Sequence, residues 1–68
     1  MQTVVIIGAG NGGLSILKIL LEAKDYQVIG VVDRQADTPG LQLARLNHIK
    51  TGSDWLEFIK DSPDIIVE

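Results

Sequence analysis

A short apolar run leads directly into a glycine-rich turn near the start of the chain, in the stretch VVIIGAGNGG over residues 4–13. The run Val4–Ile7 has no polar alternation, which is typical of a strand covered on both faces, as in a parallel sheet. The glycines that follow can adopt backbone conformations that residues with side chains disfavour, and they let another group approach the main chain closely. The chain is therefore expected to be built around a buried strand that turns sharply into its next element.

Helices and strands are predicted to alternate after this turn. Within residues 14–23 the polar positions are spaced by three and four, which places them on one face of a helix and leaves a wide apolar arc. The stretch YQVIGVVD, residues 26–33, is nearly all apolar and predicts a second strand. Thr38 then offers an N-cap, and Pro39 takes the first position of a second helix, where its missing N–H costs nothing.

The last third of the chain repeats the pattern more weakly. Ile49 marks a short third strand, and Asp54 with Glu57 resembles the capping box of a third helix. Pro63 ends that helix, and DIIVE, residues 64–68, opens a fourth strand. The apolar residues of the third helix are expected to form its core side: Trp55, Leu56, Phe58 and Ile59. Without basic residues nearby, Trp55 and Phe58 are not expected to stack on a base.

This order of elements predicts an α/β fold. We expect a three-layer, doubly wound parallel sheet, Rossmann-like but partial, with strand order 3-2-1-4. Residues 1–68 then form one dinucleotide-binding domain, near the lower size limit for a self-sufficient core. An apolar fourth strand at the edge would leave backbone groups unpaired. We therefore expect a truncated fragment of a larger protein, or a homodimer in which another copy covers this edge.

Composition excludes several classes of function. The six Lys and Arg residues are scattered and the net charge is −3, so the basic patch that binds nucleic acid is absent. No cysteine is present, which excludes disulfides and thiolate metal sites, and no other metal constellation is found. Charged residues and glycines interrupt every apolar stretch before membrane-spanning length, so no membrane contact is expected. These features predict a cytoplasmic location.

The glycine turn matches the pattern G-x-G-x-x-G and lies between a predicted strand and a predicted helix, the context that gives this motif its meaning. Gly8 permits the tight turn, Gly10 lets a pyrophosphate approach the backbone, and Gly13 lets the helix pack against the strand. The helix N-terminus would then favour the anion. Gly12 leaves further room for a ligand, and Asn11 either caps the helix or contacts phosphate.

An acidic residue completes the pattern. Asp33 ends the second predicted strand, where its carboxylate can accept hydrogen bonds from the adenosine ribose. It would repel a 2′-phosphate, so NAD is favoured over NADP, although Arg34 could stack on adenine or bind that phosphate. The alternative is that the glycines serve only a tight turn and Asp33 only caps a loop. No catalytic residue is predicted, because the single histidine, His48, has no partner in the sequence.

The chain resembles the N-terminal part of Rossmann-type NAD(P)-binding domains. Its motif region, residues 4–34, carries most of the likeness. The part from TPGLQLAR to DIIVE is similar to glucose–fructose oxidoreductase, inositol dehydrogenase and homoserine dehydrogenase N-terminal domains, and also to Rossmann-like modules at the N-terminus of bacterial signalling proteins. The resemblance assigns Gly8, Gly10 and Gly13 to phosphate and Asp33 to ribose.

Three functions follow as hypotheses. The first is an NAD(H)-binding module of a larger protein, with a sensory or regulatory role. The second is the N-terminal cofactor-binding fragment of an NAD-dependent oxidoreductase, whose catalytic residues lie outside this chain. The third is a dimerisation domain that binds no nucleotide.

Overall fold

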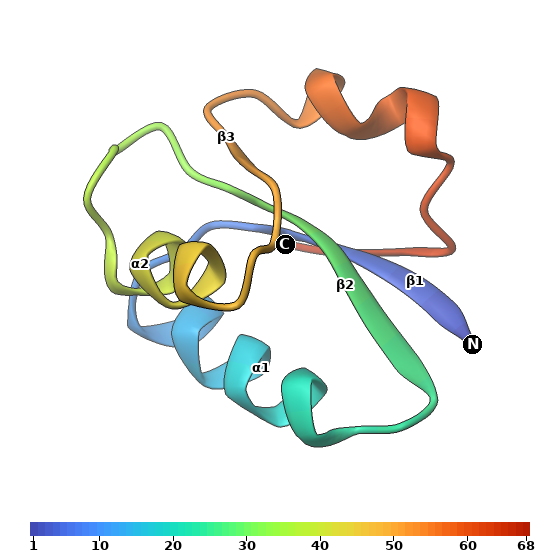
Figure 1. Cartoon of the computed structure of the whole chain (residues 1–68). Coiled ribbons are helices and arrows are strands. Elements are labelled where there is room, and N and C mark those ends of the chain that lie inside the picture. Colours follow the sequence, from blue (N-terminus) through green and yellow to red (C-terminus); the bar gives the residue numbers. More distant parts are fainter.

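The computed structural model describes residues 1–68 and contains a four-stranded parallel sheet with the order β3-β2-β1-β4. Two helices and one 3₁₀ helix connect the strands (Figure 1). The predicted α/β class and the strand order 3-2-1-4 are thereby confirmed. The elements in chain order are β1 (Gln2–Ile7), α1 (Asn11–Glu22), β2 (Tyr26–Val32), α2 (Pro39–Leu46), β3 (Thr51–Gly52), η1 (Trp55–Asp61) and β4 (Ile65–Val67).

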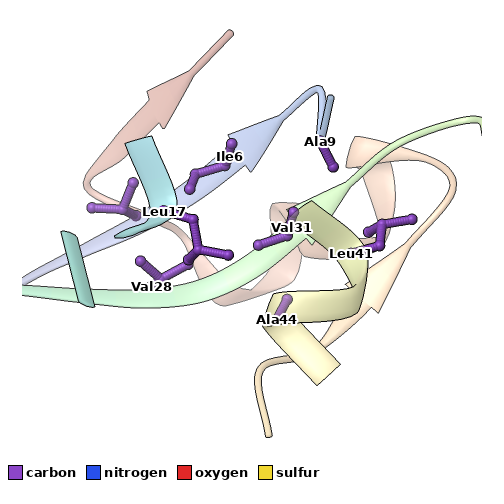
Figure 2. Packing of buried hydrophobic residues seen from close by; sticks show 8 residues of the cluster. Ile6, Ala9, Leu17, Val28, Val31, Leu41 and Ala44 are labelled. Carbon is purple, nitrogen blue, oxygen red and sulfur yellow. The ribbon is translucent and has the colours of Figure 1, made fainter. Parts of the chain in front are cut away.

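Both α-helices cover the same face of the sheet (Figure 1), and the larger part of the core lies beneath them. Successive side chains of a strand point to opposite faces, so Val4 and Ile6 of β1 share this face. Both are buried and belong to one cluster with Leu17 from α1 and Leu41 from α2. Figure 2 shows Ile6, Leu17 and Leu41 in this cluster. The predicted apolar arc of the first helix therefore meets the sheet through Leu17, although Ile19 and Leu21 of the same arc stay exposed.

The opposite face of the sheet is covered by η1. Phe58 is its one buried residue and packs against Val5 and Val32. A Cβ at Gly30 of β2 would collide with the Phe58 ring, so the ring rests directly on the backbone of that strand. Lys50 places its ammonium group 4.9 Å from the centre of the same ring. A single aromatic residue thus anchors this layer.

The third helix differs from the prediction. It is a seven-residue 3₁₀ helix, and Trp55, Leu56 and Ile59 are between 44% and 55% exposed. The expectation that these three residues pack in the core was wrong. A 3₁₀ helix has three residues per turn, so a segment of this length can press only one narrow edge onto a sheet. Phe58 occupies the buried part of that edge.

The third strand also begins later than predicted. Ile49 does not belong to a strand, because its N–H donates to the carbonyl of Ala44 at 2.9 Å and closes the end of α2. His48 just before it takes the left-handed conformation, with φ of 59°, that commonly follows a helix. The chain pairs with β2 only from Thr51 onward, over two residues.

The fourth strand lies at an edge of the sheet and pairs with β1. Thr3 and Asp64 fasten the start of this pairing: the Thr3 N–H donates to Asp64 Oδ2 at 2.8 Å, and the Asp64 N–H donates to Thr3 Oγ1 at 3.0 Å. The side chain of Ile66 in this strand is half exposed. None of the helices has both the length and the apolar character needed to cross a membrane.

Candidate functional site

The turn after β1 begins with a glycine in the left-handed region. Gly8 has φ of 97°, a conformation that residues with a Cβ rarely adopt. Its N–H donates to the carbonyl of Val32 at 2.7 Å, so the turn starts beside the end of β2. The predicted tight turn is therefore present at the predicted residue.

The next residue anchors the turn to the core. The side chain of Ala9 is fully buried and belongs to the cluster beneath the helices (Figure 2). Its peptide groups are held as well, because the Ala9 N–H donates to Asp33 Oδ2 at 2.7 Å and its carbonyl accepts from the Gly40 N–H at 2.8 Å. The glycine turn is thus fixed by contacts from the end of β2 and from the start of α2.

The N-terminus of α1 follows without a capping side chain. Gly10 is the N-cap residue, no side chain hydrogen-bonds to the helix start, and the first turn contains no acidic residue. The first N–H groups of a helix and its dipole together favour an anion. Asn11 is the first helical residue and not the cap, so the first of its two predicted roles was wrong. Its carbonyl accepts from the Ser15 hydroxyl at 3.1 Å.

The glycines of the motif meet different surroundings. A Cβ at Gly13 would collide with the backbone carbonyl of Gly8, so helix and strand touch there. A Cβ at Gly10 or Gly12 would meet nothing within 4 Å. Gly10 also has φ of −73°, which any residue can adopt. Neither a contact within the chain nor an unusual φ therefore requires a glycine at position 10, which is favoured there only by its N-cap position.

Asp33 faces the turn with both carboxylate oxygens engaged. Oδ2 accepts from Ala9, and Oδ1 accepts from the Gln35 N–H at 2.9 Å. The hydrogen bond from Gln35, followed by that from Ala9, holds the pKa of the Asp33 carboxyl below its ordinary value, although desolvation opposes them. Each oxygen has a second lone pair, so the carboxylate can still accept hydrogen bonds from a ligand.

An open cleft of about 1050 Å³ lies at the carboxyl ends of the strands. Gly8, Asp33, Arg34 and Trp55 are among the residues that line it. Ligands of open α/β sheets bind in this position, outside the carboxyl ends of the strands. The cleft is acidic overall, because three carboxylate residues line it against one arginine: Asp33, Asp54 and Glu68 against Arg34.

The predicted site residues fall into two adjoining groups. Gly8, Asp33 and Arg34 line the cleft, whereas the exposed residues at positions 10–12 and the half-buried Gly13 form the start of α1. The Ala9–Asp33 hydrogen bond joins the two groups. Ala9 and Trp55 were not predicted to belong to the site. The position of Ala9 inside the glycine motif was the only sequence feature that could have predicted its contact with Asp33. Nothing in the sequence predicted that Trp55 would be exposed at the cleft. No group of three or more residues able to hold a metal ion is present.

Comparisons with known proteins agree with this fold. A family model described as the PglD N-terminal domain matches residues 3–67. An acetaldehyde dehydrogenase of Burkholderia thailandensis is 36% identical over 61 residues, which are 90% of this chain and 20% of that enzyme. Acetaldehyde dehydrogenases of Burkholderia pseudomallei strains 668 and 1106a show the same 36% identity over 61 residues. The chain thus spans about a fifth of the length of the curated relatives it matches.

Proposed function

Because the chain belongs to the PglD N-terminal domain family and has a Rossmann-type sheet, we propose that it binds a nicotinamide dinucleotide as the front part of an oxidoreductase. In this role the start of α1 receives the diphosphate, and Asp33 accepts hydrogen bonds from the adenosine ribose. Residues 1–68 then hold the adenosine-diphosphate half of the cofactor. Catalytic groups would come from other parts of the parent protein.

The surroundings of Gly10 carry this proposal. No atom of the chain lies where its Cβ would be, and its backbone angles do not require glycine. Glycine is one of the residues preferred at an N-cap, and its missing side chain also leaves room here for the close approach of a group outside the chain. The uncapped helix start beside Gly10 makes that group an anion, as a diphosphate is. Asn11, Gly12 and Gly13 follow in the same turn and would border the phosphate groups.

The charges of the cleft favour NAD over NADP. Three carboxylate residues and one guanidinium line it, so a second phosphate on the ribose would meet net negative charge. Asp33 is the nearest of these acids to the glycine turn, since it bonds to Ala9. Arg34 lines the same cleft and is free to lie over the adenine ring. We expect tighter binding of NAD than of NADP.

The relatives support the oxidoreductase reading over a sensory one, because those matched are named acetaldehyde dehydrogenases. Nothing in the fold or the comparisons favours a signalling role. The third hypothesis, a dimerisation domain that uses the edge of β4, predicts no nucleotide binding. Titration of the chain with nucleotides therefore separates it from the proposed function.

The test uses Gly10→Ala. We expect the variant to fold with at most a modest loss of stability, because the added methyl group meets open space while alanine is a poorer N-cap residue than glycine. We expect its affinity for NAD to fall by on the order of tenfold or more, since the methyl group would stand between backbone and diphosphate. Isothermal titration calorimetry with NAD, NADP and ADP-ribose measures the affinities, and thermal unfolding followed by circular dichroism measures stability.

Two further variants serve as controls. Lys18→Ala changes an exposed residue of α1 away from the cleft and should leave both affinity and stability nearly unchanged. Gly13→Ala should destabilise the fold itself, because its methyl group would collide with the carbonyl of Gly8. The proposal fails if the original chain binds none of the nucleotides at millimolar concentration, or if Gly10→Ala binds NAD as tightly as the original chain.

A further inference from the structure

The only tryptophan of the chain lies at the cleft and not in the core. Trp55 is 44% exposed, whereas Phe58 on the same 3₁₀ helix is 1% exposed. Residues three apart in a 3₁₀ helix lie along one edge, so the two aromatic residues share the edge of η1 that faces the sheet. Phe58 fills the part over the sheet, and Trp55 reaches the part beside the cleft.

The segment that carries Trp55 is held beside the end of β2. The N–H of Asp33 donates to the carbonyl of Gly52 at 3.1 Å, which joins the residue after β2 to the last residue of β3. Two residues later Asp54 caps η1, because its carboxylate accepts from the N–H of Leu56 at 3.0 Å. The position of Trp55 relative to Asp33 is therefore set by backbone contacts rather than by a free loop.

The indole also borders an apolar pocket of about 180 Å³ on the side of the sheet covered by η1. Val5, Phe58 and Ile66 line this pocket together with Trp55. Trp55 thus borders two surroundings, apolar side chains in this pocket and the polar cleft that holds Asp33. An aromatic ring supported by apolar groups and bordering a polar cleft suits the flat face of a nucleobase, since base–aromatic stacking needs a π-face and no specific hydrogen bond.

We propose that Trp55 is the base-stacking residue of the site and contacts the adenine ring of the bound dinucleotide. The inference rests on the proposed function, and it adds a residue that neither the glycine motif nor the acidic residue supplies. Trp55 lies past the carboxyl end of β3, and Asp33 at that of β2. A ribose held by Asp33 would therefore direct its base toward η1. Arg34 lines the same cleft and can add a cation above the base.

The test exploits the fact that Trp55 is the sole source of tryptophan fluorescence. We expect AMP, ADP-ribose and NAD to cause a saturable decrease of this fluorescence, and ribose 5-phosphate to cause none. Trp55→Ala should weaken the binding of ADP-ribose by about 5-fold to 150-fold, the range for loss of one stacked base. Trp55→Phe should keep the affinity within a few-fold of the original chain.

Leu56→Ala is the matched control, because Leu56 is 55% exposed on the same helix and lines neither the cleft nor the apolar pocket. It should bind ADP-ribose like the original chain. Calorimetric binding of ADP-ribose without any change in fluorescence, or with unchanged affinity in Trp55→Ala, would overturn the stacking role and leave the proposed function standing. An absence of calorimetric binding in the original chain would overturn both. The fluorescence titration needs no variant, so misfolding of Trp55→Ala does not remove the test.

Discussion

At the scale of single residues, the Ala9 peptide connects the fold to the site. Its methyl group is buried in the core, its carbonyl accepts from Gly40 of α2, and its N–H donates to Asp33. Asp33 therefore has a structural role even without a ligand, because it holds the turn that begins with Gly8. A ligand that bonds to Asp33 would find the carboxylate already oriented, which reduces the entropy cost of binding.

The Asp33 contact predicts a pH dependence of stability. The two N–H donors lower the pKa of this carboxyl in the folded chain relative to the unfolded one. Its contribution to the free energy of unfolding is thus complete above the unfolded pKa of about 4 and is lost as the pH falls through the lower folded pKa. Urea unfolding of the original chain and of Asp33→Asn at a series of pH values measures this contribution.

We expect the original chain to be more stable than Asp33→Asn near neutral pH and the difference to shrink below about pH 4. A difference that stays constant across this range would mean that the charge of Asp33 does not support the turn. The hydrogen bond between Ala9 and residue 33 would then be independent of ionisation.

At the scale of elements, η1 is attached to the sheet by only a few side chains. One buried ring, that of Phe58, and one capping carboxylate, that of Asp54, are its main attachments. The predicted capping box is present only in part, since Asp54 accepts from Leu56 while no bond from Glu57 back to the Asp54 N–H is formed. Thr38 likewise lies at the predicted N-cap of α2, but its hydroxyl makes no capping bond and is buried without a partner.

Removal of the cap on η1 should weaken this element. We expect Asp54→Ala to lower the free energy of unfolding by about 1 kcal/mol, the usual effect of losing an N-cap side chain. Asp61→Ala, at the exposed last position of the same helix, should change it by less than about 0.5 kcal/mol. Chemical denaturation of both variants measures the difference. Equal effects of the two substitutions would show that the cap contributes nothing specific.

At the scale of the whole molecule, the two faces of the sheet are covered unequally. Two α-helices lie on one face and a single 3₁₀ helix on the other (Figure 1). Trp55, Ile59 and Ile66 remain half exposed around the smaller pocket on that second face. A domain of this size has a small core, so we expect its free energy of unfolding to be on the order of a few kcal/mol. Ligand binding should therefore change its melting temperature strongly.

We expect NAD at about 100 times its Kd to stabilise the chain by about 2.7 kcal/mol, through binding to the folded state alone. For a domain of this length such a gain corresponds to a rise in Tm of roughly 10–20 °C. Differential scanning calorimetry at several NAD concentrations measures it. Gly10→Ala should show a much smaller rise at the same concentrations, and an unchanged Tm of the original chain at saturating NAD would contradict the proposal.

The sequence by itself determined the α/β class, the strand order and the glycine turn with its nearby acid. The class and the turn follow from apolar runs, helical spacing and glycines, which are local properties of the sequence, and the strand order follows from the rules for crossovers between parallel strands. Gly8 and Gly13 show this well, because a positive φ and a strand–helix contact each require a missing side chain at that position.

Only the tertiary structure decided the start of β3, the 3₁₀ form of η1 and the surroundings of Trp55. The N–H of Ile49 donates to the carbonyl of Ala44 and so closes the end of α2. An apolar residue alone does not show whether its N–H will bond to a helix end or to a neighbouring strand. Trp55 has a largely apolar side chain, yet its exposure depends on how much of the sheet η1 can cover. Burial depends on which elements pack together, so Trp55 could be identified as a base-stacking candidate only from the tertiary structure.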